Sequence, residues 1–323
     1  MEQKEESGME RSNGRGRRKQ EAIQRGTGLI VCVFCFLTAL PLLMLFADSL
    51  MGEQELLETC GAVLSGGEGQ AGFSLFPLYP TLRAYLRLLL DSPEYFTAFW
   101  NAMFQTVGVL LGQLLVAVPA AWAFARFCFP GKKALWFLYM LLMILPFQVT
   151  MVSGYLVLNK VHLMDTHGAV ILPGIFSALP VFILQKTFAG IPGEIIEAAR
   201  IDGAGSVKIF LEIGIPLGKS GIFSILLLGF LEYWNAIEPP MTYLKTKSLW
   251  PLSLYLPQMA NSETASAFAA SVVTLLPATL LFFTGQENLE QGIVASGVER
   301  GKKEGQRSTD RFVSKGEDRG SAG

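Results

Sequence analysis

The sequence predicts an all-α, polytopic membrane protein with six transmembrane helices. Hydrophobic residues make up 51% of the 323-residue chain and charged residues only 16%, against about 25% in an average soluble domain. The charged residues are concentrated in residues 1–25 and 299–323. The stretch between these ends carries too little charge to cover the surface of a soluble globule. This composition excludes collagen-like, disulfide-stapled and mostly disordered chains, and it favours a membrane domain with two solvated tails.

Runs without charged residues locate the spans, because about 20 mostly apolar residues are needed to cross the hydrocarbon core. A sixth run, Ser220–Ile237, is interrupted only by Glu232. The first run is too long for a secretory signal peptide and lacks a clear cleavage site, so it is interpreted as an uncleaved anchor. We expect a transmembrane domain over residues 26–295, with spans at about 26–47, 97–125, 134–158, 168–185, 220–237 and 264–285.

Basic residues predict the orientation of the spans. With six spans, both termini and alternate loops lie on one side, and that side holds 21 of the 26 lysines and arginines. We therefore expect residues 1–25 to be a cytoplasmic tail and residues 296–323 to be a disordered cytoplasmic tail. The chain would be a multi-pass protein of the cell membrane with both termini in the cytoplasm.

Two glycines in the second span, Gly108 and Gly112, are separated by three residues. Small residues at this spacing let the backbone of another helix approach closely. The spacing is compatible with a close helix contact, but in a chain with 33 glycines it also arises by chance.

One cytoplasmic loop, residues 190–217, is far longer than a turn between two helices requires. Pro192 suits a first helical turn, and Gly203 interrupts the helix that follows. The small side chains of Ala198 and Ala199 keep one helix face thin, so that another surface can approach it. From these residues alone, the loop is either a helix–turn–helix that fits a groove in a partner or a helix that lies on lipid.

The spacing of this loop resembles the EAA loop of ABC importer permeases. The matching pattern is Glu197-Ala198-Ala199, three residues, Gly203, nine residues, Ile213, one residue, then Ile215 and Pro216. Other stretches resemble the carbohydrate-importer type, the branch of the second maltose permease. They are Ala123–Phe127 with Gly131–Lys133, Pro146–Thr150 and Trp234-Asn235.

The resemblance implies the fold of a type I ABC importer permease. Such a subunit pairs with a second permease subunit, separate ABC ATPase subunits bind below it, and an extracytoplasmic solute-binding protein delivers a sugar from above. The resemblance assigns contact with the ATPase to Glu197, Ala198, Ala199, Asp202, Gly203, Ile213 and Pro216. We expect no cofactor, no metal and no nucleic-acid partner.

Glu232 departs from the family pattern, which usually has a small or hydroxyl residue there. A carboxylate in a span is costly unless it is paired or wet. Glu232, with Trp234 and Asn235, therefore marks a candidate translocation path, touching polar solute or a basic group of the partner permease. The alternative is that the helix ends there, at the membrane interface.

We expect a transporter subunit rather than an enzyme. No Ser/His/Asp set, paired carboxylates or metal-ligand spacing is evident. Gly214–Ser220 resembles a P-loop, but Ile213 stands where the first glycine belongs and Pro216 lacks a backbone donor. The alternative functions are an importer permease for a non-sugar solute (polyamine, peptide or phosphate) and, less favoured, a self-sufficient secondary carrier.

Overall fold

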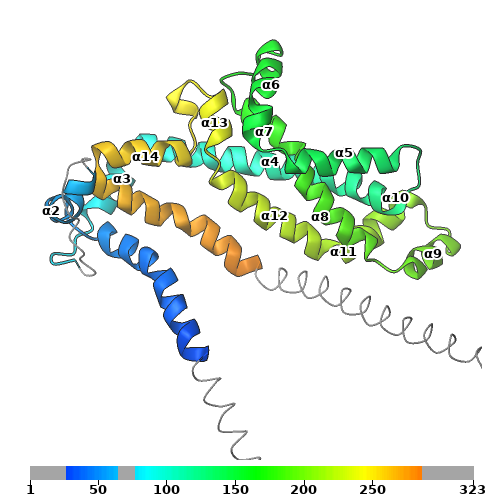
Figure 1. Cartoon of the computed structure of the whole chain (residues 1–323), viewed down its shortest axis with the longest axis horizontal. Coiled ribbons are helices and arrows are strands. Elements are labelled where there is room, and N and C mark those ends of the chain that lie inside the picture. Colours follow the sequence, from blue (N-terminus) through cyan, green and yellow to red (C-terminus); the bar gives the residue numbers. More distant parts are fainter. Residues whose placement is uncertain (1–26, 65–76, 286–323) are drawn as a thin grey trace, which may run out of the picture. The chain divides into compact units, whose positions relative to one another are not determined.

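The computed structural model describes residues 27–64 and 77–285. All regular structure in these two ranges is helical and neither contains a strand, which confirms the all-α prediction (Figure 1). The predicted cytoplasmic tails, residues 1–25 and 296–323, lie outside the described residues.

The chain divides into two compact units. Among the described residues, the first comprises those up to Asp91 together with Met259–Val272, and the second comprises Ser92–Gln258 together with those from Val273 to Gly285. The first unit contains the apolar helix Thr27–Ser49, α2 (Glu53–Leu64) and α3 (Arg83–Asp91). Within it the hydroxyl groups of Ser49 and Tyr85 are hydrogen-bonded at 2.8 Å.

The second unit is built around α4 (Pro93–Arg126), a 34-residue helix that packs against α7, α8 and α12. At 1.5 Å per residue α4 is about 50 Å long, which exceeds the hydrocarbon thickness of about 30 Å. The helices that follow it are α5 (Lys132–Ile144), α6 (Phe147–Lys160), α7 (His167–Ile175), α8 (Ala178–Ala189), α9 (Gly193–Ile201) and α10 (Ser206–Ile209). Next come a π-helix (Phe210–Gly214), α11 (Ile215–Leu217), α12 (Lys219–Trp234), α13 (Glu238–Tyr243), a 3₁₀ turn (Lys247–Leu249) and α14 (Leu252–Ser262).

Four of the described helical segments are long and apolar enough to cross a membrane: Thr27–Ser49, Pro93–Arg126, His167–Ala189 and Thr264–Gly285. Each covers one of the spans expected from the sequence. Two further segments pass the same test only as bent pairs of helices, so the described chain has six spans when each pair is one span.

The expected third span, residues 134–158, is not one straight helix. It consists of α5 and α6, which meet at an angle of 105°. Pro146 explains the break, because a proline disfavours the helical conformation of the residue before it and lacks a backbone donor. Accordingly Leu145 is extended, with φ −69° and ψ 120°.

The expected fifth span, residues 220–237, is shorter than predicted, because α12 ends at Trp234. The segment Ser206–Leu217 meets α12 at an angle of 67°. Gly218 stands at this bend and lies directly against Phe188 of α8, where an added Cβ would be 2.3 Å from the ring. The close approach of α8 therefore leaves no room for a side chain at this bend.

The two glycines of α4 face the side chains of α7. A Cβ added to Gly112 would be 2.3 Å from Ile175, and one added to Gly108 would be 3.0 Å from Ile171. The expected close contact is therefore made inside this chain, between α4 and α7. It lets the isoleucine side chains lie on the backbone of α4.

Candidate functional site

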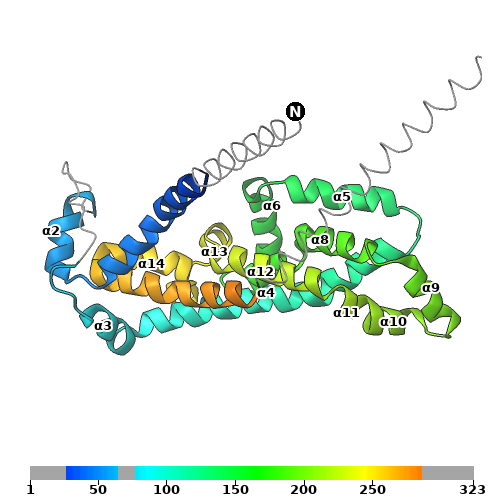
Figure 2. The ribbon, with the colours of Figure 1, turned by 90° about the horizontal axis from the view of Figure 1, so that it is seen from below.

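The candidate site begins with the elbow, defined as residues 190–217, which follows α8 and leads into α12. In it α9 and α10 form a helix–turn–helix at one end of the second unit, beside the end of α4 (Figure 1, Figure 2). Gly203 makes the turn with φ +82°. Its N–H donates to the carbonyl of Arg200 at 3.0 Å, and the N–H of Ala204 donates to that of Ala199 at 2.9 Å. This pair of bonds is a Schellman motif, which favours glycine at the left-handed position.

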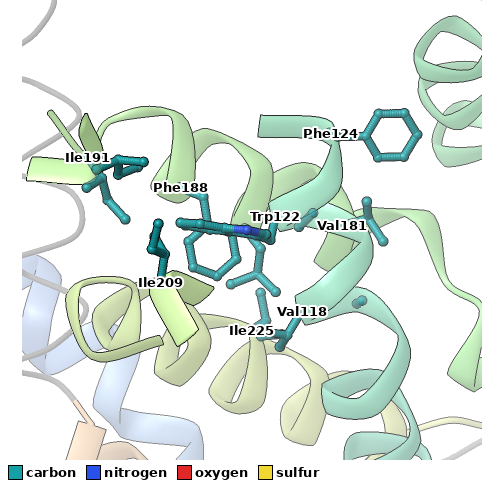
Figure 3. Packing of buried hydrophobic residues seen from close by; sticks show 12 residues of the cluster. Val118, Trp122, Phe124, Val181, Phe188, Ile191, Ile209 and Ile225 are labelled. Atoms are coloured by element: carbon teal, nitrogen blue, oxygen red, sulfur yellow. The ribbon is translucent and has the colours of Figure 1, made fainter. Parts of the chain in front are cut away.

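The two faces of the elbow differ in burial. Ile196 of α9 and Ile209 of α10 belong to the core cluster around Trp122, which Figure 3 shows with Ile209 beside the indole ring. On the other face Ile201 is 87% exposed and Val207 is 71% exposed. Apolar side chains this exposed on one helical hairpin are expected to lie against either a partner or lipid.

The structure places the seven residues assigned to ATPase contact on both sides of this boundary. Those on the exposed side are Glu197, Ala198, Asp202, Gly203 and Pro216. Ala199 and Ile213 are half-buried and pack against the core cluster. Of the seven residues, the elbow therefore presents the carboxylates of Glu197 and Asp202 outward, while Ala199 and Ile213 pack it against the rest of the unit.

A contact of Gly214 was missed by sequence reasoning, which noted this residue only as part of a P-loop-like run. Gly214 ends the π-helix, and an added Cβ there would be 2.7 Å from the ring of Trp122. The run Gly214–Ser220 is helical on both sides of Gly218, so its backbone N–H groups do not converge on a phosphate-sized hollow. Its role here is packing.

The second part of the site is the end of α12. Glu232 and Asn235 are exposed, and Asn235 donates from Nδ2 to the carbonyl of Leu231 at 2.8 Å. Among the ion pairs of the described residues, none involves Glu232. An exposed and unpaired carboxylate on an apolar helix is expected to face water, solute or a partner rather than lipid.

Trp234 lies in the core and does not reach the exposed face of α12. Its side chain is only 3% exposed, stacked on Phe230 at 5.3 Å between ring centroids and edge-on to Phe99 at 5.7 Å. Its Nε1–H donates to the carbonyl of Thr274 at 3.3 Å. The structure thus separates Trp234 from Glu232 and Asn235, although the three are neighbours in sequence.

A buried polar network joins α4, α7 and α12 in the same unit. The side-chain amide of Gln113 donates to the carbonyl of Gly174 at 2.9 Å and to the hydroxyl of Tyr233 at 3.2 Å. The Tyr233 hydroxyl donates to the same carbonyl at 3.2 Å. The helix is interrupted just beyond Gly174, at Phe176 and Ser177. The network therefore supports the backbone where α7 gives way to α8.

Within the described parts of the chain, no group of three or more His, Cys, Asp and Glu side chains is arranged to hold a metal ion. Of the two histidines, His167 receives a hydrogen bond from the amide of Gln105 at 3.2 Å if its Nδ1 is unprotonated. His162 belongs to the turn after α6, with φ +57°.

Comparison with solved structures supports the fold. The chain is similar to a chain of a bacterial ABC transporter involved in the import of the acidic polysaccharide alginate, with a TM-score of 0.73, 21% identity, and coverage of 84% of this chain and 97% of that one. A structure of the bacterial alginate transporter with its pentasaccharide-bound periplasmic protein gives a TM-score of 0.57 at 14% identity, covering 80% and 91%. At these identities the likeness shows the fold.

Curated relatives match most of the chain. An arabinooligosaccharide transport permease of Halalkalibacterium halodurans is 26% identical over 268 residues, which is 81% of this chain and 92% of the relative. A galactooligosaccharide transport permease of Bacillus subtilis is 27% identical over 251 residues, covering 75% and 89%. An sn-glycerol-3-phosphate transport permease of Yersinia enterocolitica is 26% identical over 211 residues, covering 64% and 75%.

The family match covers the elbow, the polar network and the end of α12. Residues 113–295, more than half of the chain, match the family described as binding-protein-dependent transport system inner membrane component. The chain therefore belongs to this family of ABC importer permeases, whose members span the membrane and carry no ATPase site of their own.

Proposed function

We propose that this chain is the membrane-spanning permease subunit of an ATP-driven sugar importer. It pairs with a second permease, receives a sugar from an extracytoplasmic solute-binding protein, and is driven by separate ABC ATPase subunits. The observation that carries the proposal is the exposed face of the elbow, with Ile201 and Val207 outward and Ile196 and Ile209 fixed in the core. A hairpin anchored on one face and apolar on the other suits a partner's groove.

The relatives support a sugar as the solute. Two of them are named for arabino- and galactooligosaccharides, and a permease of Streptomyces coelicolor, 28% identical over 209 residues, is named for diacetylchitobiose uptake. An organic phosphate is the second candidate, because another relative is named for sn-glycerol-3-phosphate. On the proposal that Glu232 lies on the translocation path, its carboxylate would repel an anion, which favours a neutral sugar over an organic phosphate.

The orientation is part of the proposal. Both termini and the elbow would lie in the cytoplasm, where the ATPase is, as the distribution of basic residues predicts. In a cysteine-free background, Ile201→Cys should react with a membrane-impermeant maleimide in inside-out vesicles and not in right-side-out vesicles. The opposite pattern would place the elbow outside and end the proposal.

Gly203→Asp tests the contact with the ATPase. A Cβ at Gly203 meets nothing within 4 Å in this chain, and aspartate tolerates positive φ, so the subunit should fold and insert normally. An unpaired charge pressed into an interface costs about 3–5 kcal/mol, so the ATPase that copurifies with the subunit should fall by more than about tenfold.

Gly131→Asp is the matched control. Gly131 also has a positive φ, of +80°, and also has open space around its Cβ, but it lies in the turn before α5. It should leave ATPase binding and uptake unchanged. Unchanged ATPase binding in Gly203→Asp would show that the elbow is not the docking element.

A further inference from the structure

The last turn of α4 contacts the chain at the base of the elbow. Arg126, the final residue of α4, donates from Nη2 to the carbonyl oxygen of Phe188 at 2.6 Å and to that of Ile191. Phe188 lies in the last turn of α8, and Ile191 lies two residues before α9 begins. One guanidinium thus bridges the junction between the two helices, through charge-assisted hydrogen bonds to backbone groups.

The junction itself has little regular structure of its own. Between Ala189, which ends α8, and Gly193, which begins α9, the chain passes through Gly190, Ile191 and Pro192. Pro192 has no backbone donor, and a glycine offers wide conformational freedom. The N–H groups of Gly190 and Ile191 bond back to carbonyls of α8, so the bond from Arg126 to the carbonyl of Ile191 adds a link from this segment to α4.

Trp122 contacts the other end of the elbow from the same face of α4, one helical turn before Arg126. Its ring lies 5.7 Å from the guanidinium carbon of Arg126, 5.3 Å from the ring of Phe188 and 5.6 Å from the ring of Phe210. Its surface also lies against Gly214. Figure 3 shows Phe188, Ile191 and Ile209 gathered around the indole. A single turn of α4 therefore contacts the elbow where it leaves α8 and where it returns toward α12.

We propose that Arg126 and Trp122 form a clamp that fixes the direction of the elbow relative to α4, so that movement of the ATPase is transmitted to the spans. Both are positioning residues, since neither lies on the exposed face of the elbow. The proposal rests on the proposed function. It also gives a role to Arg126 in the Ala123–Phe127 stretch, which the proposed function leaves without one.

The test uses the complete importer, with the second permease, the ATPases and the solute-binding protein, in vesicles. Arg126→Gln removes both bonds at the junction. We expect the variant to insert and to retain the ATPase, but to hydrolyse at least about ten times more ATP per solute imported. Hydrogen exchange of the α9 amides should rise by a similar factor, because the junction is released. A role in stability alone would lower the amount of complex without changing the ATP-to-solute ratio.

Lys133→Gln is the matched control, since it also removes one positive charge near the α4–α5 connection, but Lys133 is an exposed residue in the first turn of α5. It should change neither readout. Arg126→Lys should restore part of the coupling, because an ammonium can still donate to one carbonyl but lacks the reach of the guanidinium. If Arg126→Gln fails to assemble, Trp122→Phe tests the clamp instead, because it replaces the ring that reaches Gly214 with a smaller one. The ATP-to-solute ratio and the hydrogen exchange of α9 are measured in the same way.

An unchanged ATP-to-solute ratio in an assembled Arg126→Gln complex overturns the clamp, and so does unchanged exchange in α9. Hydrogen exchange does not depend on transport, so it can test the clamp even if the proposed importer function is wrong. A wild-type chain that joins no ATPase refutes the proposed function, and exchange in Arg126→Gln then decides whether the clamp holds the elbow.

Discussion

The carboxylate of Asp165 binds the backbone and side chain of Thr246. Its Oδ1 accepts the N–H groups of Lys245 and Thr246, both at 2.8 Å, and its Oδ2 accepts the Thr246 hydroxyl at 2.6 Å. The N–H of Asp165 donates in turn to the carbonyl of Tyr243 at 3.0 Å. The turn after α6 and the loop after α13, 80 residues apart in sequence, are thereby joined.

The pKa of Asp165 follows from these bonds. The hydroxyl and N–H of Thr246, with the N–H of Lys245, hold the pKa of this carboxyl below its ordinary value of about 3.9. A lowered pKa in the folded state stabilises the fold above the unfolded pKa, and this contribution is lost as the pH falls through the folded value. The contribution should therefore be constant between about pH 5 and pH 8 and should decline as the pH falls below about 4.

The Asp165→Asn variant measures the contribution of this carboxylate to the stability of the fold, because asparagine tolerates the φ of +59° but carries no charge. The variant should unfold at a lower temperature than the wild type in detergent at pH 7, and the difference should shrink toward zero as the pH falls below about 4. Asp202→Asn, in which the altered carboxylate lies on the exposed face of the elbow, is the control. A difference in unfolding temperature that does not shrink as the pH falls below about 4 would contradict the assignment.

Gly112→Ala should destabilise the subunit by about 1–3 kcal/mol, because the new methyl group overlaps Ile175. Gly108→Ala should cost less, since its nearest contact is at 3.0 Å instead of 2.3 Å. Thermal unfolding in detergent measures both. Ile175→Ala in the same chain should restore part of the loss in Gly112→Ala. Absence of any rescue would mean that α4 and α7 do not meet through these residues.

Tyr233→Phe and Gln113→Leu should each destabilise the chain, and together they should lose less than the sum, because the two side chains bond to each other. Coupling energies in membrane proteins average about 0.6 kcal/mol and reach about 1.7. A double-mutant cycle by reversible unfolding in detergent would measure the coupling. A coupling energy of zero would mean that Gln113 and Tyr233 do not act together to support the backbone between α7 and α8.

Glu232→Gln tests the translocation path in the assembled importer. If Glu232 accepts hydrogen bonds from the solute, its loss should lower uptake about tenfold or more, since a hydrogen bond to a charged group contributes about 1.5–3 kcal/mol. Glu94→Gln, an exposed glutamate at the start of α4, should have no effect. Wild-type uptake by Glu232→Gln would end the idea that Glu232 contacts the solute.

The order of the helices and the existence of the elbow could be predicted from local patterns. Runs without charge mark the spans because hydrocarbon excludes charge, and the run at 264–285 coincides with an apolar helix over those residues. The turn at Gly203 follows from the left-handed conformation that a helix end favours. Such features depend on a residue and its neighbours along the chain.

Contacts between distant segments could not be predicted in this way. The sequence placed Trp234 with Glu232, yet the structure buries one and exposes the other. It marked Gly112 as a close-contact residue without naming Ile175, and it offered Arg126 only as part of a resemblance. The spacing of four residues between Trp122 and Arg126 was a signal that both side chains lie on the same face of a helix.

The sequence by itself determined that this chain is a bundle of membrane helices with a hairpin between two of them, because both depend on periodicity, charge and local backbone preference. Only the tertiary structure decided that one turn of α4 holds both ends of that hairpin. Which faces of two helices meet depends on side chains that are remote in sequence and fill one shared volume, and no single segment encodes that volume.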